Sequence, residues 1–176
     1  MGTRDPYESF IGELKERWVN SKGFKPPIQG CTVAQINRIM VYQSVEYLPK
    51  LYRQFMLEFG QEAGGLPSTG EFRYPYVLDF KKDDQPPLWY LGDPLILPSD
   101  SFIFMTDYDA YALFFQTTDR VDDPFLYRIE ENVDHSVDEE GRDLFLKVVR
   151  DVRLSAFLVD WVEESIENAE CETRRL

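Results

Sequence analysis

The sequence predicts a single-domain α+β fold: a mostly antiparallel sheet flanked by N-terminal helices and a C-terminal helix. Apolar residues recur at helical spacing near both ends of the chain, in residues 7–20 and again after residue 155. Between these regions, short aromatic and β-branched runs follow one another, separated by Pro, Asp and Gly. Consecutive strands flanked by helices favour an antiparallel layer, whereas regular alternation of strands and helices would favour a parallel sheet.

The first predicted helix spans residues 7–20. Residues 21–23 end this helix, and Pro26 and Pro27 favour an extended linker, because proline disfavours helix in the residue before it. Residues 1–30 are therefore expected to form an N-terminal helix and a linker. The apolar face of the helix consists of Tyr7, Phe10, Ile11, Leu14 and Trp18.

Two further helices are indicated by their terminal residues. Thr32 and Gln35 have the spacing of a capping box, in which each side chain bonds the backbone N–H of the other residue. Pro49 opens the third helix, because a proline in the first turn lacks only an N–H that has no partner within the helix. Gly60 ends this helix. Its buried face is expected to contain Leu51, Tyr52, Phe55, Met56 and Phe59.

An antiparallel hairpin is the clearest strand feature. Residues 102–105 and 111–117 are strand-like runs, and the turn between them is rich in aspartate, which hydrogen-bonds its own backbone in turns. Alternation of side chains predicts another strand over residues 125–130. Further strands are predicted over residues 71–80, 89–91, 95–97 and 144–149.

The C-terminal part of the chain combines a loop and a helix. Residues 132–142 are acidic with little apolar content, so we assign them to an exposed loop. Ser155 is expected to cap the final helix, and residues 170–176 are expected to fray. The buried stripe of this helix is expected to contain Phe157, Leu158, Trp161, Val162 and Ile166.

The charge of the chain restricts its partners. Its 32 acidic and 19 basic residues give a formal net charge of −13, which repels phosphate backbones and anionic lipid headgroups. Nucleic acids and membranes are therefore poor partners, and a basic protein is a good one. Residues 1–10 do not resemble a signal peptide, and Cys31 and Cys171 are too far apart for a small disulfide scaffold. We expect a cytoplasmic protein with reduced thiols.

The residues that usually carry catalysis are sparse. The single histidine, His135, lies in the acidic loop, and no nucleophile or orienting partner is placed to converge on it. The aspartates of residues 107–109 and 119–123 lack the glycine turn and bidentate Glu of an EF-hand loop. Gly64 and Gly65 follow a helix without a Lys-Ser/Thr pair, which indicates a turn and not a phosphate-binding loop. We therefore expect no catalytic residues, no metal and no cofactor.

Several short motifs occur in a fixed order along the chain. They are LPKLYRQF (residues 48–55), the glycine pair (64–65), LPSD (97–100), YALFF (111–115) and SAFL (155–158). This order resembles the SMI1/KNR4 (SUKH) superfamily, in which a similar helix start, glycine pair and terminal helix recur. On this resemblance, residues 1–176 are expected to form a single SMI1/KNR4-like domain. The chain departs from the pattern at Gln61-Glu62-Ala63, which delay the glycine pair, and at Ala110, where a glycine often stands.

The resemblance implies a helix-flanked antiparallel sheet without a conserved catalytic centre. It also implies, for bacterial members, the neutralisation of toxins such as nucleases and deaminases by direct binding. The leading hypothesis is therefore a non-enzymatic immunity protein, monomeric or weakly homodimeric, with a basic toxin domain as its partner. A regulatory scaffold, the role of fungal members, and a carboxylate-dependent metalloenzyme are the alternatives. Solubility alone also explains the acidity.

The partner-binding surface is predicted where turns concentrate negative charge. These positions combine exposure in turns with one aromatic side chain that anchors a contact, and rim charges of this kind accelerate association with a basic partner. Reversing two of them, Asp122 and Asp123, to lysine is expected to slow association with a basic partner and to flatten its salt dependence, while leaving the fold nearly unchanged. The predicted surface consists of Asp107, Tyr108, Asp109, Asp119, Asp122, Asp123, Glu130 and Glu131.

Overall fold

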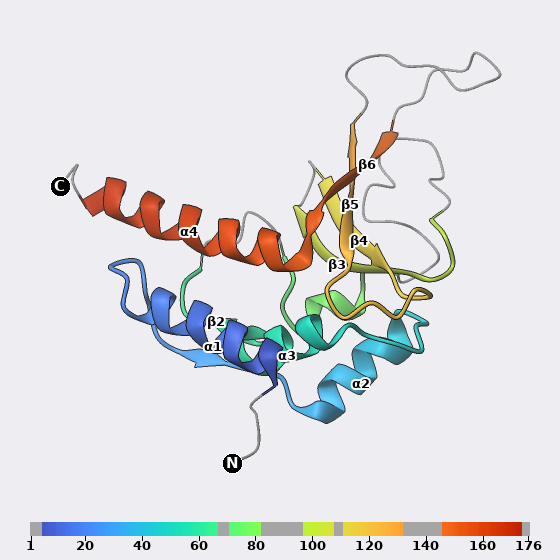
Figure 1. Ribbon diagram of the computed structural model, residues 1–176, viewed down its shortest axis with the longest axis horizontal. Helices are drawn as coiled ribbons and strands as arrows, with labels where there is room; N and C mark the ends of the chain where they lie inside the picture. The colour runs from blue at the N-terminus through green and yellow to red at the C-terminus, as the bar shows by residue number, and fades with distance from the viewer. Residues whose placement is uncertain (1–4, 67–70, 82–96, 108–110, 132–145, 174–176) are drawn as a thin grey trace.

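The computed structural model of the chain describes residues 5–66, 71–81, 97–107, 111–131 and 146–173. These residues form an α+β fold with a four-stranded antiparallel sheet and a separate two-stranded ribbon (Figure 1), which confirms the predicted fold class. The elements are α1 (Pro6–Val19), β1 (Ile28–Gln29), α2 (Val33–Tyr42), α3 (Lys50–Phe59), β2 (Glu62–Ala63), the 3₁₀ turn η1 (Tyr76–Leu78), β3 (Ser101–Asp107), β4 (Tyr111–Gln116), β5 (Phe125–Glu131), β6 (Leu146–Arg153) and α4 (Leu154–Thr173).

The three N-terminal helices lie where the sequence predicts them. The capping box of α2 is present: the Thr32 N–H donates to Gln35 Oε1 (2.7 Å), and the Gln35 N–H donates to Thr32 Oγ1 (3.2 Å). Helix α3 follows Pro49 and ends at Phe59, before Gly60. The predicted buried face of α3 is confirmed, since Leu51, Tyr52, Phe55, Met56 and Phe59 are all buried.

The main sheet is an antiparallel meander with the strand order β3-β4-β5-β6. The predicted hairpin is formed by β3 and β4, in which Phe102 pairs with Phe115. The strand predicted over residues 125–130 is β5, and the last strand, β6, begins and ends later than residues 144–149. Each strand of the main sheet thus pairs with the next one in sequence.

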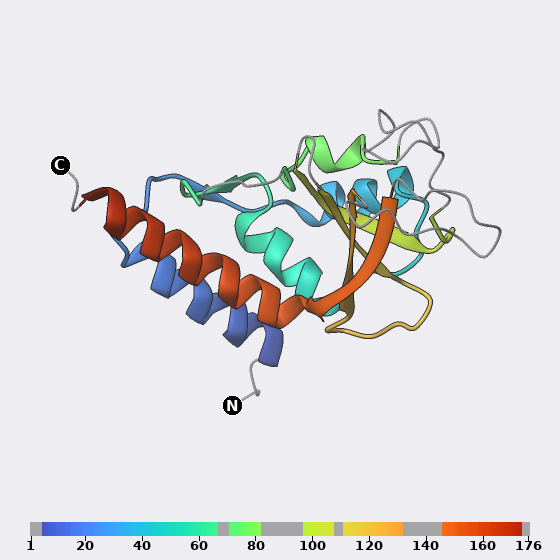
Figure 2. The ribbon, with the colours of Figure 1, turned by 90° about the horizontal axis from the view of Figure 1, so that it is seen from above.

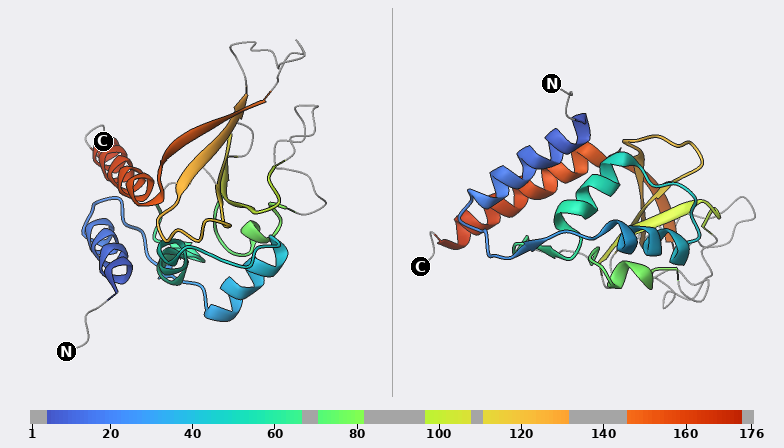
Figure 3. Two further views of the ribbon diagram at one scale, coloured as in Figure 1. Left: turned by 45° about the vertical axis from the view of Figure 1, so that its right-hand side comes forward. Right: turned by 90° about the horizontal axis from the view of Figure 1, so that it is seen from below.

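Helix α3 links the helical layer to the sheet. Tyr52 packs edge-to-face on Phe102 and Phe115, with ring centroids 5.0 and 5.6 Å apart, and Phe55 packs on Trp161 of α4 at 6.1 Å. Helices α1 and α4 lie side by side along the outer side of α3 (Figures 2 and 3). Of the predicted core residues, Leu14, Trp18, Phe55, Phe59 and Trp161 are buried and Phe157 is half-buried.

The open edge of β3 is paired by a side chain. The amide of Gln43, which is fully buried, donates to the Ile103 carbonyl (2.6 Å) and accepts from the Ile103 N–H (2.9 Å). The same amide nitrogen donates to the Val77 carbonyl (3.1 Å). Gln43 therefore satisfies buried backbone groups that would otherwise be costly, and it ties the end of α2 to the sheet.

Several predictions differ from the structure. Residues 71–80 contain an isolated bridge at Glu71 and the 3₁₀ turn η1 instead of a strand, because Pro75 has no N–H for a ladder. Ser155 is not the cap of α4, and residues 170–173 are helical instead of frayed. Residues 89–91, 95–96 and 132–142, including His135, lie outside the described residues.

Candidate functional site

The structure places the predicted partner-binding residues at two ends of the main sheet. Asp107 and Glu130 flank Tyr111 across three neighbouring strands, and Glu131 follows at the same end. Tyr108 and Asp109 lie outside the described residues. The other three form a separate group in the β4–β5 loop, residues 117–124, one strand length or about 20 Å away. That loop group is Asp119, Asp122 and Asp123.

Asp122 caps the N-terminus of α3. Its Oδ1 accepts from the Tyr47 hydroxyl (2.5 Å) and from the Lys50 N–H (3.3 Å), and its Oδ2 pairs with Lys50 Nζ (3.1 Å). Its backbone carbonyl accepts from the Leu51 N–H (3.3 Å). Pro49, which precedes the helix, makes no side-chain cap, so Asp122 supplies the acceptors that the first turn of α3 lacks.

Asp123 does the same for α4. Its Oδ1 accepts from the Ser155 N–H (2.9 Å) and its Oδ2 accepts from the Ser155 hydroxyl (2.7 Å). The next residue, Pro124, accepts the Leu154 N–H (2.9 Å) with its carbonyl. Ser155 therefore donates hydrogen bonds to the capping residue, Asp123, and is not the cap itself. Two consecutive aspartates, Asp122 and Asp123, thus cap two different helices.

This double cap contradicts the expectation that Asp122 and Asp123 are free to be reversed in charge. Their carboxylates are half-buried and occupied by helix N-termini, where a lysine would meet the positive end of the helix dipole. Asp119, Arg120 and Val121 are exposed instead, and within the described part of the chain Asp119 and Arg120 form no ion pair. The hydrogen bonds of Asp122 and Asp123 therefore fix the loop, while the side chains of Asp119, Arg120 and Val121 remain accessible to a partner.

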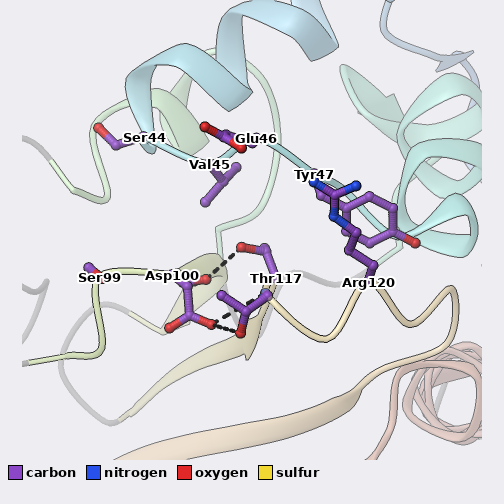
Figure 4. A pocket seen from close by; sticks show the side chains of 9 residues that line it. Ser44, Val45, Glu46, Tyr47, Ser99, Asp100, Thr117 and Arg120 are labelled. Carbon is purple, nitrogen blue, oxygen red and sulfur yellow. Dashed lines mark hydrogen bonds between the residues drawn. The ribbon is translucent and has the colours of Figure 1, made fainter.

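A pocket of about 370 Å³ opens beside this loop. It lies between the α2–α3 connection, the start of β3 and the β4–β5 loop (Figure 4). Its lining includes Ser44 and Arg120, which have φ angles of 54° and 50° and are the non-glycine residues with positive φ in the described part of the chain. Left-handed backbone costs about 1–2 kcal/mol at such residues and is concentrated at functional sites. The pocket is lined by Ser44, Val45, Glu46, Tyr47, Ser99, Asp100, Thr117, Thr118 and Arg120.

The floor of the pocket is tied to the loop by Asp100. Its Oδ2 accepts from the Thr118 hydroxyl (2.6 Å), and its carbonyl accepts from the Thr117 hydroxyl (2.9 Å) and N–H (3.1 Å). Burial alone would raise the pKa of Asp100, but the hydrogen bonds from Thr118, a backbone hydrogen bond of Asp100 itself and the charge of Lys81 together outweigh burial and lower the pKa. Glu46 stands exposed at the rim, so two carboxylates and the Arg120 guanidinium surround the opening.

The ionisation of Asp122 couples the loop to pH. Burial alone would raise the pKa of Asp122, but the hydrogen bonds from Tyr47 and Lys50 outweigh it, so the pKa is lowered. Burial, followed by the bond to Asp122, raises the pKa of Tyr47 and keeps that hydroxyl a donor.

Asp122→Asn is therefore expected to reduce the acid sensitivity of the fold. A carboxylate whose folded pKa is depressed stabilises the fold above the unfolded value of about 4, and this contribution is lost as the pH falls through the folded value. Urea unfolding between neutral pH and about pH 2.5 measures the effect. Asp119→Asn, the same change on an exposed side chain, should keep the acid profile of the wild type. Equal profiles for Asp122→Asn and the wild type would contradict the role of Asp122.

Sequence reasoning found the loop but not the pocket. Ser44, Tyr47 and Arg120 carry no local pattern that marks them, because their proximity depends on how α2, α3 and the sheet pack. Within the described residues, no group of three or more His, Cys, Asp or Glu side chains is arranged to hold a metal ion. None of the described helices has the length and apolar character needed to cross a membrane.

Comparison with known proteins adds no further assignment. No family model, no curated protein and no solved structure matches the chain. The resemblance to SMI1/KNR4 therefore stays a prediction.

Proposed function

We propose that the chain is a non-enzymatic protein-binding domain of the immunity type, which neutralises a basic nuclease- or deaminase-type toxin by direct binding. The observation that carries the proposal is the double cap: Asp122 and Asp123 hold the β4–β5 loop so that Asp119, Arg120 and Val121 stand exposed beside the pocket. The proposed contact surface is this loop together with Glu46 at the pocket rim.

Two physical arguments support binding at this surface. The loop is held at one end by the bonds of Asp100 to Thr117 and Thr118, and at the other by the two caps. Such a loop loses little conformational entropy when a partner binds, so less of the favourable interaction energy is offset. The net charge of −13 accelerates encounter with a cationic protein, and carboxylates at the surface replace the phosphates that a nuclease or deaminase would bind.

The first experiment identifies the partner. Pull-down from the source organism with the tagged chain, followed by mass spectrometry, is expected to recover a basic toxin domain. Recovery of a protein without toxin activity would favour the regulatory scaffold, and a partner that binds equally well to acid-unfolded chain would contradict a folded binding surface.

Asp119→Lys is then expected to slow association with that partner by roughly tenfold at low salt, because rim charges act mainly on encounter. The same variant should flatten the salt dependence of the association rate. Stopped-flow or surface-plasmon kinetics at several ionic strengths measure both effects.

Glu164→Lys on α4 is the matched control, because it is an exposed residue with the same change in net charge. It should slow association less than Asp119→Lys does. Equal slowing by both variants would mean that only the total charge matters, and a larger effect of Glu164→Lys would move the binding surface to α4.

A further inference from the structure

A long segment of this acidic chain contains no acidic residue. Residues 17–45 have no Asp or Glu, although the whole chain has 32 of them. The charged residues in this segment are Arg17, Lys22, Lys25 and Arg38. Helix α2 lies entirely within it, so its ten residues interrupt the negative charge that marks the rest of the protein.

The outer face of α2 is largely apolar and carries one charged residue, Arg38, where a solvated helix face normally carries several. The inner face contains Ile36 and Ile39, which are fully buried. On the outer face, Val33, Val41 and Tyr42 are 55%, 75% and 45% exposed. A helix that is apolar on both sides is typical of one that is buried on both sides. We define the α2 face as the exposed residues Val33, Ala34, Asn37, Arg38, Val41 and Tyr42.

The α2 face also has the composition of a protein interface. The Arg38 guanidinium lies over the Tyr42 ring, 5.3 Å from its centroid, and Nη2 is 3.3 Å from the Tyr42 hydroxyl. Tyr76, in the neighbouring turn η1, is 55% exposed. Tyrosine and arginine are, with tryptophan, enriched among the residues that dominate binding energy at interfaces.

We propose that the α2 face binds the α2 face of a second copy of this chain in an antiparallel pair. Charge decides between the possible partners. A basic protein would meet Arg38 and no carboxylate on this face, so the partner that suits the β4–β5 loop does not suit α2. Two copies that each carry −13 repel one another less where acidic residues are absent, as they are along α2.

The residue order of α2 is self-complementary in such a pair. With the two-fold axis between residues 37 and 38, Asn37 of one copy lies opposite Arg38 of the other, so an amide oxygen accepts from a guanidinium. The same axis places the small Ala34 opposite Val41. It also places Val33 opposite the Tyr42 ring. Each position of the α2 face thus meets a compatible side chain.

The pair is expected to be weak and to tighten with salt. The ten residues of α2 span about 15 Å, so the interface lies at the small end of specific contacts and we expect a dissociation constant on the order of 100 μM. Salt screens the repulsion between the two acidic chains and leaves the apolar contact intact. The proposed binding of a basic partner weakens with salt, so the two interactions respond in opposite directions.

Sedimentation equilibrium of the full chain tests the proposal. Measurements from about 10 μM to about 1 mM, at ionic strengths of about 0.05 and 0.5 M, are expected to show a monomer–dimer equilibrium that is tighter at the higher salt. Val41→Glu should weaken the dimer by at least about tenfold, because the two-fold axis brings two new carboxylates into the interface and each must lose water to be buried there. Its circular-dichroism spectrum and melting temperature should match the wild type, since Val41 is 75% exposed.

Val148→Glu is the matched control, because Val148 is 48% exposed on the edge strand β6 and undergoes the same change. This variant should dimerise like the wild type. A wild-type chain that stays monomeric up to about 1 mM at both salts would overturn the proposal. A dimer lost in Val148→Glu but retained in Val41→Glu would overturn it too, and would place the contact at the sheet edge.

Discussion

Replacing Trp161 by alanine should lower the free energy of unfolding by about 3 to 5 kcal/mol, the usual cost of removing a large buried aromatic side chain. Trp161 is 6% exposed and lies where α4 meets α3 and the segment before η1. Its ring packs edge-to-face on Phe72, with centroids 5.1 Å apart, and on Phe55 at 6.1 Å. Alanine leaves a cavity between three elements that cannot close together without moving α4. Urea or thermal unfolding measures the change.

Trp161→Phe is the control that separates the loss of buried ring volume from the loss of the indole N–H donor. The indole Nε1 of Trp161 is buried without a hydrogen-bond partner among the described residues, and such a donor costs about 1 to 3 kcal/mol. Phenylalanine removes this donor and keeps most of the ring contacts, so the loss should stay below about 1 kcal/mol. A loss as large as that of the alanine variant would show that the indole nitrogen is satisfied in solution.

Replacing Asp122 and Asp123 together by alanine should lower the free energy of unfolding by about 2 to 3 kcal/mol, because each cap is worth about 1 kcal/mol and each carboxylate also bonds a side-chain donor. The two residues serve different helices, through Lys50 of α3 and Ser155 of α4. The single variants should therefore contribute nearly additively in a double-mutant cycle.

Asp119→Ala is the control for this pair of caps. Asp119 lies in the same loop but is exposed and pairs with no described residue, so its loss should change stability by less than about 0.5 kcal/mol. If the double variant lost as little stability as Asp119→Ala, the two caps would not stabilise the fold. Charge reversal at Asp122 and Asp123 could then be used to test partner binding without a change in stability.

Local patterns were sufficient to predict most helices and the central hairpin. Thr32 and Gln35 lie three residues apart, so their capping box can be recognised without knowledge of the fold. The apolar stripe of α3 is equally local, because every third or fourth residue faces the same side. Residues 71–80 misled the prediction because Val77 and Leu78 are apolar for packing, in a 3₁₀ turn, and not for strand pairing.

The candidate site depends on contacts that no local pattern encodes. Asp123 and Ser155 are 32 residues apart, and Asp122 and Tyr47 are 75 residues apart. Read locally, Asp122 and Asp123 look like any acidic turn, so the sequence suggested solvent exposure. The sequence did place Asp119 correctly on the surface of this loop, because a turn position without an apolar neighbour pattern is usually exposed.

The double cap also bears on how cooperatively the chain folds. A helix normally carries its own start signal, and formation of its first turn is the costly step. Helices α3 and α4 instead obtain part of their N-terminal capping from Asp122 and Asp123 in the short loop between β4 and β5. Neither helix is therefore fully capped until β4 and β5 have paired and fixed this loop. The sheet and the two helices on which the core depends should therefore appear and disappear in one kinetic step, with the β4–β5 connection already structured in the transition state.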